Sequence, residues 1–196
     1  MNFSTFLLMR QEMILLAIIL LLLVAEIAIS NSKKHSIVHL AIFLFGIHTI
    51  VGFFPIESNS MFGGMFRTND LIQFFKNVIN VGVLILLLQS ADWIQEKIID
   101  ENKGAEFFIL LLSSLLGMYF MISSGDFLMF YLGLELSTLP VAALAAFEVT
   151  KRISSEAGIK LIFSAALASG ISLFGISMLY ATSGSIYFDD MLTSLS

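Results

Sequence analysis

Residues 13–25 of the chain read Met-Ile-Leu-Leu-Ala-Ile-Ile-Leu-Leu-Leu-Leu-Val-Ala, an unbroken apolar run. With its flanks this run extends from Glu12 to Ser30, close to the roughly 20 residues that cross a ~30 Å hydrocarbon layer. Further runs of this kind lie at 36–54, 71–90, 105–124, 126–149 and 157–182. Continuous runs are typical of transmembrane helices, whereas strands of a membrane barrel would alternate. The sequence therefore predicts an all-α fold, a polytopic transmembrane bundle of about six helices.

The first run also has features of a cleaved signal peptide, with Arg10 before it and small residues near Ala28. However, Glu26 interrupts the region where cleavage would occur, and five more apolar runs follow. We therefore expect a retained first helix rather than a removed leader.

Composition supports a membrane protein and excludes several other classes. Of the 196 residues, 58% are hydrophobic and 13% charged, whereas soluble domains are about 45–50% apolar and about 25% charged. The absence of cysteine excludes disulfides, thiolate zinc sites and iron–sulfur ligation. No phosphate-binding glycine loop and no His-Glu-x-x-His motif occurs. With a net charge of -5 and no basic tail, the chain is not expected to bind nucleic acid. We expect no cofactor or metal in this chain.

Orientation follows from the loops, because cytoplasmic loops are enriched in lysine and arginine. One set of loops carries six such residues, namely Lys33, Lys34, Lys97, Lys103, Lys151 and Arg152. The opposite set carries only Arg10 and Arg67. The first set is therefore predicted to face the cytoplasm, which puts both ends of this chain outside.

Glu135 is the sharpest candidate for function. It lies in the middle of an apolar run, where a charge costs about 2.5–3.5 kcal/mol by insertion scales. Pro140 frees the carbonyl of Leu136 one turn back, and Ser137 and Thr138 add hydroxyl groups. A carboxylate beside a loosened helical turn suits a proton-holding site. The alternative is a buried structural carboxylate that is paired with another helix.

Lys160 is the second candidate and begins a stripe that continues with Ser164 and Ala168. Small residues along this run favour close helix packing, which would make Lys160 a proton carrier on a packed face. The alternative is that its side chain extends to the cytoplasmic surface. Lys76 is a secondary candidate that the same explanation covers, because it lies early in its span. Asp126 suits a helix N-terminus.

Motifs in the second half of the chain resemble the antiporter-like subunits of complex I. They are Ser123-Ser-Gly-Asp126, Leu134-Glu-Leu-Ser-Thr-Leu-Pro140 and Glu156-Ala-Gly-Ile-Lys160, and the second is most similar to the N branch of the bacterial family. The resemblance extends over nearly the whole chain. It identifies Glu135 and Lys160 with the family's buried Glu and Lys on helices five and six.

The resemblance implies proton translocation coupled to quinone reduction, in a bacterial inner membrane and beside other membrane subunits of complex I. NADH, FMN, iron–sulfur clusters and quinone would be used by those other subunits, so no redox centre is expected here. Members have about fourteen helices. Residues 1–104 would hold helices one to three, and residues 105–196 would begin the first repeat with helices four to six. We therefore expect the chain to be a fragment or one piece of a split subunit.

Two alternatives stay open. An Mrp-type cation/proton antiporter or a membrane-bound hydrogenase subunit would share the fold. A membrane anchor without transport activity is also possible, but it would gain nothing from the cost of a charge at Glu135.

Overall fold

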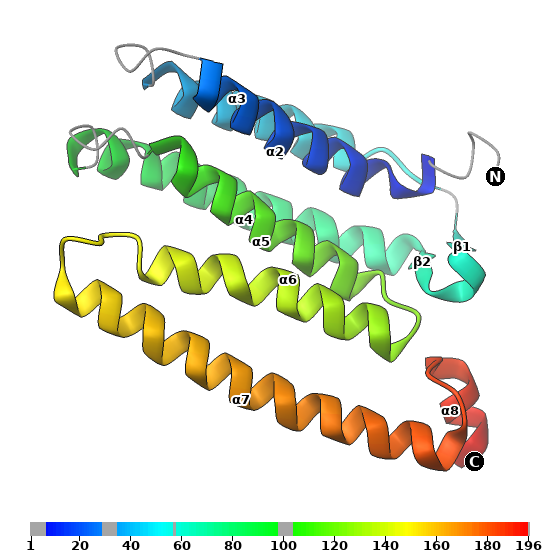
Figure 1. Cartoon of the computed structure of the whole chain (residues 1–196). Helices are drawn as coiled ribbons and strands as arrows, with labels where there is room; N and C mark the ends of the chain where they lie inside the picture. Colours follow the sequence, from blue (N-terminus) through cyan, green and yellow to red (C-terminus); the bar gives the residue numbers. More distant parts are fainter. Residues whose placement is uncertain (1–6, 29–34, 57, 98–103, 196) are drawn as a thin grey trace. The chain divides into compact units, whose positions relative to one another are not determined.

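The computed structural model describes residues 7–28, 35–56, 58–97 and 104–195. Within these ranges the chain is built almost entirely from helices, so the predicted fold class is confirmed (Figure 1). The α-helices are α2 (Arg10–Ala28), α3 (His35–Gly52), α4 (Asp70–Lys97), α5 (Gly104–Ile122), α6 (Phe127–Ala145), α7 (Arg152–Ser183) and α8 (Phe188–Leu195). The shorter elements are η1 (Leu7–Met9), β1 (Asn59–Met61), η3 (Phe62–Gly64) and β2 (Phe66–Thr68).

The predicted apolar runs all form helices. Among the described residues, five candidate spans contain at least 18 residues and are apolar enough to cross a membrane; they are drawn from α2, α4, α5, α6 and α7. The remaining one, α3, is an apolar helix over Ser36–Gly52 and slightly shorter. At 1.5 Å per residue, the 19 residues of α6 extend over ~28 Å, which matches the hydrocarbon layer.

The chain divides into two compact units, which we describe separately. The N-terminal unit consists of Met1–Glu57 and Asn69–Ser113, and the C-terminal unit of Ser58–Thr68 and Ser114–Ser196. The change from one unit to the other falls within helix α5.

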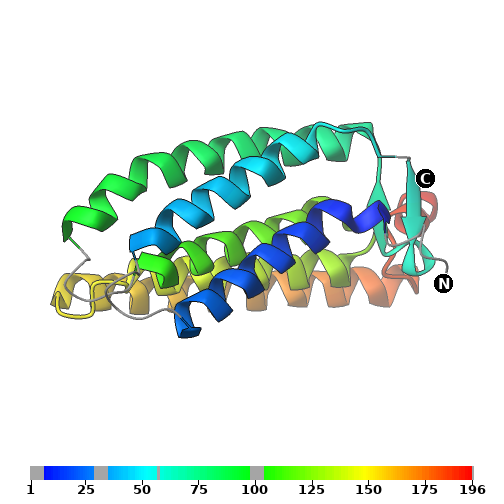
Figure 2. The same ribbon diagram turned by 90° about the horizontal axis from the view of Figure 1, so that it is seen from above.

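In the N-terminal unit, α3 packs against both α2 and α4. Both views show α3 and α4 side by side with opposite chain directions (Figures 1 and 2). Leu15, Leu22 and Phe45 are fully buried, while Leu20, Phe43 and Ile47 are exposed. Polar side chains lie inside with the buried apolar ones: Gln11, Glu12, His48, Thr49, Gln73, Lys76 and Asn80. Apolar surface outside and polar groups within suit a lipid surrounding.

In the C-terminal unit, α5 and α6 cross at two glycines. A Cβ atom at Gly133 would lie 2.6 Å from the backbone nitrogen of Met121, and one at Gly117 would overlap the backbone nitrogen of Ser137. A Cβ atom at Gly158 of α7 would likewise lie 2.5 Å from Cβ of Ala146. Small residues at such crossings let membrane helices pack backbone to backbone.

Two short elements correct the sequence interpretation. The all-α prediction places no strand between the apolar runs at 36–54 and 71–90, but β1 and β2 pair there as an antiparallel hairpin. Gly63 and Gly64, with φ of 67° and 97°, make its turn. Three-residue strands are too short to show the alternation that predicts a strand. No helix is predicted after the last apolar run, which ends at residue 182, but α8 forms there and buries Met191.

Candidate functional site

Glu135 lies one residue from the middle of α6 and is partly buried. Its Oε1 atom is buried, and no described residue gives it a hydrogen bond. A buried carboxylate oxygen without a donor is costly in an apolar surrounding. This oxygen therefore requires a proton, a water molecule or a donor from elsewhere.

The hydroxyl groups next to Glu135 do not supply that donor. Ser137 Oγ donates to the carbonyl of Leu134 at 2.8 Å, and Thr138 Oγ1 lies 3.0 Å from the same carbonyl. Thr138 Oγ1 is also 3.2 Å from the carbonyl of Glu135 itself. Both hydroxyls therefore donate to the backbone of their own helix.

The backbone around Glu135 is less uniform than that of a regular helix. Pro140 lies inside α6 and cannot donate to the carbonyl of Leu136. From α5, Ser114 Oγ donates to the carbonyl of Ser137 at 2.9 Å. Gly133, at the crossing of α5 and α6, lies within one turn of Glu135. The carboxylate, the free carbonyl of Leu136 and the hydrogen-bonded carbonyl of Ser137 therefore lie close together in the C-terminal unit.

Lys160 is placed differently from the expectation of a packed face. Its Nζ atom lies 2.6 Å from Oε1 of Glu156, one turn earlier, and the two side chains are 73% and 55% exposed. Ser164 and Ala168 are exposed as well. The face of α7 that carries the buried residues Gly158 and Ser169 is a different one. Lys160 is paired with Glu156, and it gives no hydrogen bond to the buried Oε1 atom of Glu135.

Lys76 is not a surface lysine, which corrects the interpretation that its side chain extends to the membrane boundary. It forms an ion pair with Oε1 of Glu12, and the two side chains are only 4% and 2% exposed. The other carboxylate oxygen, Oε2, is buried with no hydrogen-bond partner among the described residues. The N-terminal unit thus contains a buried charge pair, whereas Glu135 belongs to the C-terminal unit.

Sequence reasoning missed Glu12 as a functional candidate because a carboxylate at the start of a span is usually interfacial. One signal was available. Helices α2 and α4 begin on the same predicted side, and Glu12 and Lys76 lie ~3 Å and ~9 Å along them at 1.5 Å per residue. Opposite charges at similar depths in helices that begin on one side are candidates for pairing.

Asp126 lies at a helix N-terminus, as its position in the sequence predicts. Asp126 caps α6, where its side chain accepts a hydrogen bond from the Met129 backbone nitrogen at 2.7 Å. His48 is buried beside the ring of Phe45, with centroids 5.6 Å apart. In the part of the chain that the structure describes, no three His, Asp or Glu residues gather into a candidate metal site.

Comparison with known proteins adds independent findings. Residues 124–195 match the family described as NADH:quinone oxidoreductase/Mrp antiporter, transmembrane. NADH-quinone oxidoreductase subunit N of Phocaeicola vulgatus is 39% identical over the whole chain, and that of Azobacteroides pseudotrichonymphae is 38% identical. The chain spans 41% of the length of each of these relatives.

A solved structure has the same fold. In the respiratory complex I of Thermus thermophilus with bound aureothin, one chain matches 90% of this chain with a TM-score of 0.71. The sequence identity is 20%, and 38% of that chain is covered.

Proposed function

Because this chain belongs to the family of antiporter-like membrane subunits of NADH:quinone oxidoreductase, we propose that it contributes to proton translocation in the membrane arm of that enzyme. Its partners would be the other membrane subunits of the complex and the lipid bilayer. NADH oxidation and quinone reduction, with FMN and iron–sulfur clusters, would take place in other subunits. The protein would lie in a bacterial inner membrane with its N-terminus outside.

The unpaired Oε1 of Glu135 is the observation that carries this proposal. A carboxylate in an apolar bundle stays charged only while a donor or a cation faces it, and otherwise takes up a proton. A change in its neighbours can therefore change its proton occupancy. That property is what a translocating subunit needs from a residue in the middle of a helix.

The other candidate groups take supporting roles in this proposal. Lys160 lies ~12 Å from the start of α7 at 1.5 Å per residue, near the predicted cytoplasmic side. It would pass protons from that side into the helix bundle. Lys76 with Glu12 would form a secondary site in the N-terminal helices. Ser137, Thr138, Pro140 and Ser164 would shape the path. The division at residue 104 between the first three helices and the repeat stays a prediction.

The decisive experiment replaces Glu135 with Gln in the assembled enzyme. Gln keeps the size and polarity of the side chain but cannot carry the charge or release the proton. We expect the rate of proton uptake that is coupled to NADH oxidation in inverted membrane vesicles to fall at least tenfold. The loss of a proton-transferring group typically costs about 10²–10⁴-fold. Glu148→Gln is the matched control, because Glu148 forms a surface pair with Lys151 at 2.6 Å. Unchanged proton uptake per NADH in Glu135→Gln would make this residue structural.

The role of Lys160 requires its own comparison. Lys160→Met and Glu156→Gln both abolish the surface ion pair, but only the first removes the exchangeable ammonium proton. If Lys160 carries protons, Lys160→Met slows proton uptake while Glu156→Gln does not. Equal behaviour of the two variants would limit Lys160 to the surface pair. Non-additive losses in Glu135→Gln/Lys160→Met would place both residues on one pathway.

An Mrp-type antiporter is the second candidate, because the matched family description includes that class. Sodium-dependent proton movement in vesicles without any electron donor would favour it. The two full-length relatives are both named for the oxidoreductase, and their names favour the first candidate.

A further inference from the structure

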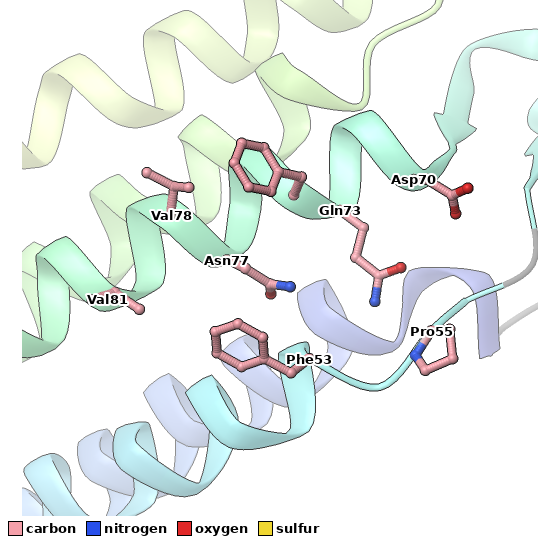
Figure 3. Close-up of a pocket in the computed structure, with 8 residues that line it drawn as sticks. Phe53, Pro55, Asp70, Gln73, Asn77, Val78 and Val81 are labelled. Carbon is pink, nitrogen blue, oxygen red and sulfur yellow. The ribbon is translucent and has the colours of Figure 1, made fainter.

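A groove of about 450 Å³ runs along the beginning of α4 in the N-terminal unit (Figure 3). Phe74, Val78 and Val81 of α4 line it together with Phe53 and Pro55, which follow from α3. All the large apolar side chains among them are strongly exposed. Its volume is within the range of pockets that hold a small organic molecule. A groove with these walls on a membrane helix is suited to an acyl chain.

Polarity changes along the groove. Asp70, the first residue of α4, lies at one end, and Val81 lies ~16 Å further along the helix at 1.5 Å per residue. The carboxylate of Asp70 is exposed and forms no ion pair with any described residue. This end therefore carries an uncompensated negative charge at the edge of the predicted span, and the rest is apolar. The occupant must be amphipathic, with a cationic head.

The amide side chains of the groove differ in what they offer to a ligand. Gln73 is saturated, because its Nε2 donates to the carbonyls of Gly52 and Phe54 at 3.0 and 2.5 Å and its Oε1 accepts from Ile56. Asn77 uses only its oxygen, which accepts from Gln11 at 3.3 Å. Its amide group projects from α4 at the wall of the groove, and no described residue accepts a hydrogen bond from its nitrogen (Figure 3).

That NH₂ group lies ~10 Å along the helix from Asp70, at a depth where an acyl chain offers no acceptor. An ester carbonyl would satisfy it. In a glycerolipid the ester groups lie below the head group and above the acyl chains, which is the same order as the acceptor-seeking Asn77 between Asp70 and Val81. The order of the two polar groups and the apolar wall thus fits one glycerolipid molecule.

We propose that this groove is a binding site for a glycerophospholipid with an ammonium head group. The ammonium group lies against Asp70, an ester carbonyl accepts from Asn77, and one acyl chain follows Phe74, Val78 and Val81. An anionic lipid without an amine is disfavoured by the charge of Asp70. This inference requires only that the chain lies in a membrane and does not depend on proton translocation.

Native mass spectrometry of the chain purified in mild detergent tests the site, with phosphatidylethanolamine and phosphatidylglycerol of equal chain length as probes. We expect the unchanged protein to retain phosphatidylethanolamine preferentially. Asp70→Asn is expected to lower that preference about fivefold, the effect of one charge at a membrane surface. Val78→Trp fills the groove and is expected to abolish retention. Leu88→Trp, at an exposed position of α4 outside the groove, is the matched control.

Equal retention of the two lipids, or retention that survives Val78→Trp, overturns the proposal. A photo-crosslinking residue at Val78 in native membranes distinguishes the remaining occupants. A lipid adduct that contains a primary amine supports the site. An adduct to another protein means that a neighbouring subunit covers the groove and overturns it. Because both readouts are of binding, a failure here leaves the Glu135 experiment unaffected, and the reverse also holds.

Discussion

Glu12 and Lys76 show how costly a single side chain becomes inside a membrane bundle. Each of the two charges is buried, and each is compensated by the other. Removing both charges can leave stability nearly unchanged, whereas removing one strands its partner in an apolar surrounding. The consequences of substitution therefore depend on the pair and not on either residue alone.

We expect Lys76→Met alone to destabilise the protein by about 3–5 kcal/mol. Glu12→Leu/Lys76→Met, which removes both charges, is expected to recover most of that loss. Unfolding in mixed micelles with increasing dodecyl sulfate measures both free energies. If the double variant is as unstable as Lys76→Met, the two charges are stabilised by other buried polar side chains of the N-terminal unit and not by each other.

The sequence predicted part of this site, because a charge in the middle of an apolar run is conspicuous. Glu135 was identified in this way, together with Pro140. Glu12 and Lys76 lie near the ends of their spans, where an exposed and a buried charge give the same sequence pattern. The packing of α3 against both α2 and α4 determines that Glu12 and Lys76 are buried within the N-terminal unit. Likewise, the exposure of Lys160 depends on which face of α7 meets α6.

The crossing of α5 and α6 brings the backbones of the two helices into direct contact. Gly133 and Gly117 allow backbone contact, and any side chain there meets backbone atoms, which cannot rotate away. The two helices are thus locked together near the middle of α6, next to Glu135.

Replacing Gly133 with Ala is expected to destabilise the chain by about 1–3 kcal/mol, because the added methyl group overpacks the crossing. Gly170→Ala is the matched control on α7, since its Cβ would have no described atom within 4 Å. Alanine raises helix propensity at both positions, so the control is expected to be neutral or slightly stabilising. Thermal unfolding in detergent compares the two. Equal effects would mean that the crossing opens readily.

A bidentate ion pair joins helix α8 to the β-hairpin. Nη1 and Nη2 of Arg67 donate to the two carboxylate oxygens of Asp189 at 3.0 and 2.7 Å. These hydrogen bonds hold the pKa of Asp189 below its usual range. The contribution of the pair is therefore complete above the unfolded carboxyl pKa, near 4, and is lost only as the pH falls through the lower folded value.

The protection that this contact gives to the α8 amides should accordingly be independent of pH between 8 and 5, after correction for intrinsic exchange rates. Asp189→Asn at neutral pH is expected to raise that exchange modestly, because the pair is mostly exposed. Asp190→Asn, which leaves the Arg67 contact in place, serves as the control. Protection that is identical in Asp189→Asn would show that other contacts, such as Phe127 against Phe188, hold the helix.

The elements themselves were predicted to different degrees. Long apolar runs gave the existence and approximate bounds of α2 to α7, because burial in lipid requires both length and continuous hydrophobicity. The hairpin and α8 gave no comparable signal. They form through contacts between distant segments, such as the hydrogen bond from Arg67 N to Ser123 O at 2.8 Å.

At the scale of the whole molecule, the proposed topology depends on the distribution of lysine and arginine. Lys33, Lys34 and Lys103, which contribute to that count, lie outside the described residues. Lys151 and Arg152 are described: Lys151 directly precedes α7, and Arg152 is its first residue. Arg67 lies in the hairpin that bonds to the turn before α6, so it marks the opposite end of this 19-residue helix.

Labelling of single cysteines checks this topology, since the chain has no native cysteine. Thr150→Cys and Ser60→Cys are both exposed and flank opposite ends of α6. We expect a membrane-impermeant maleimide to label Ser60→Cys from outside and Thr150→Cys only from the cytoplasmic side. Reversed labelling would invert the orientation, and labelling of both from one side would contradict a spanning α6.

The buried pair of Glu12 and Lys76 also constrains how the protein is made. Glu12 leaves the ribosome 64 residues before Lys76. Throughout that interval the nascent α2 carries an acid whose cation has not yet been synthesised, and hydrocarbon tolerates an unmatched charge poorly. We therefore expect helix α2 to reach its final place only after α4 has emerged, so that the first helices are inserted together rather than one by one.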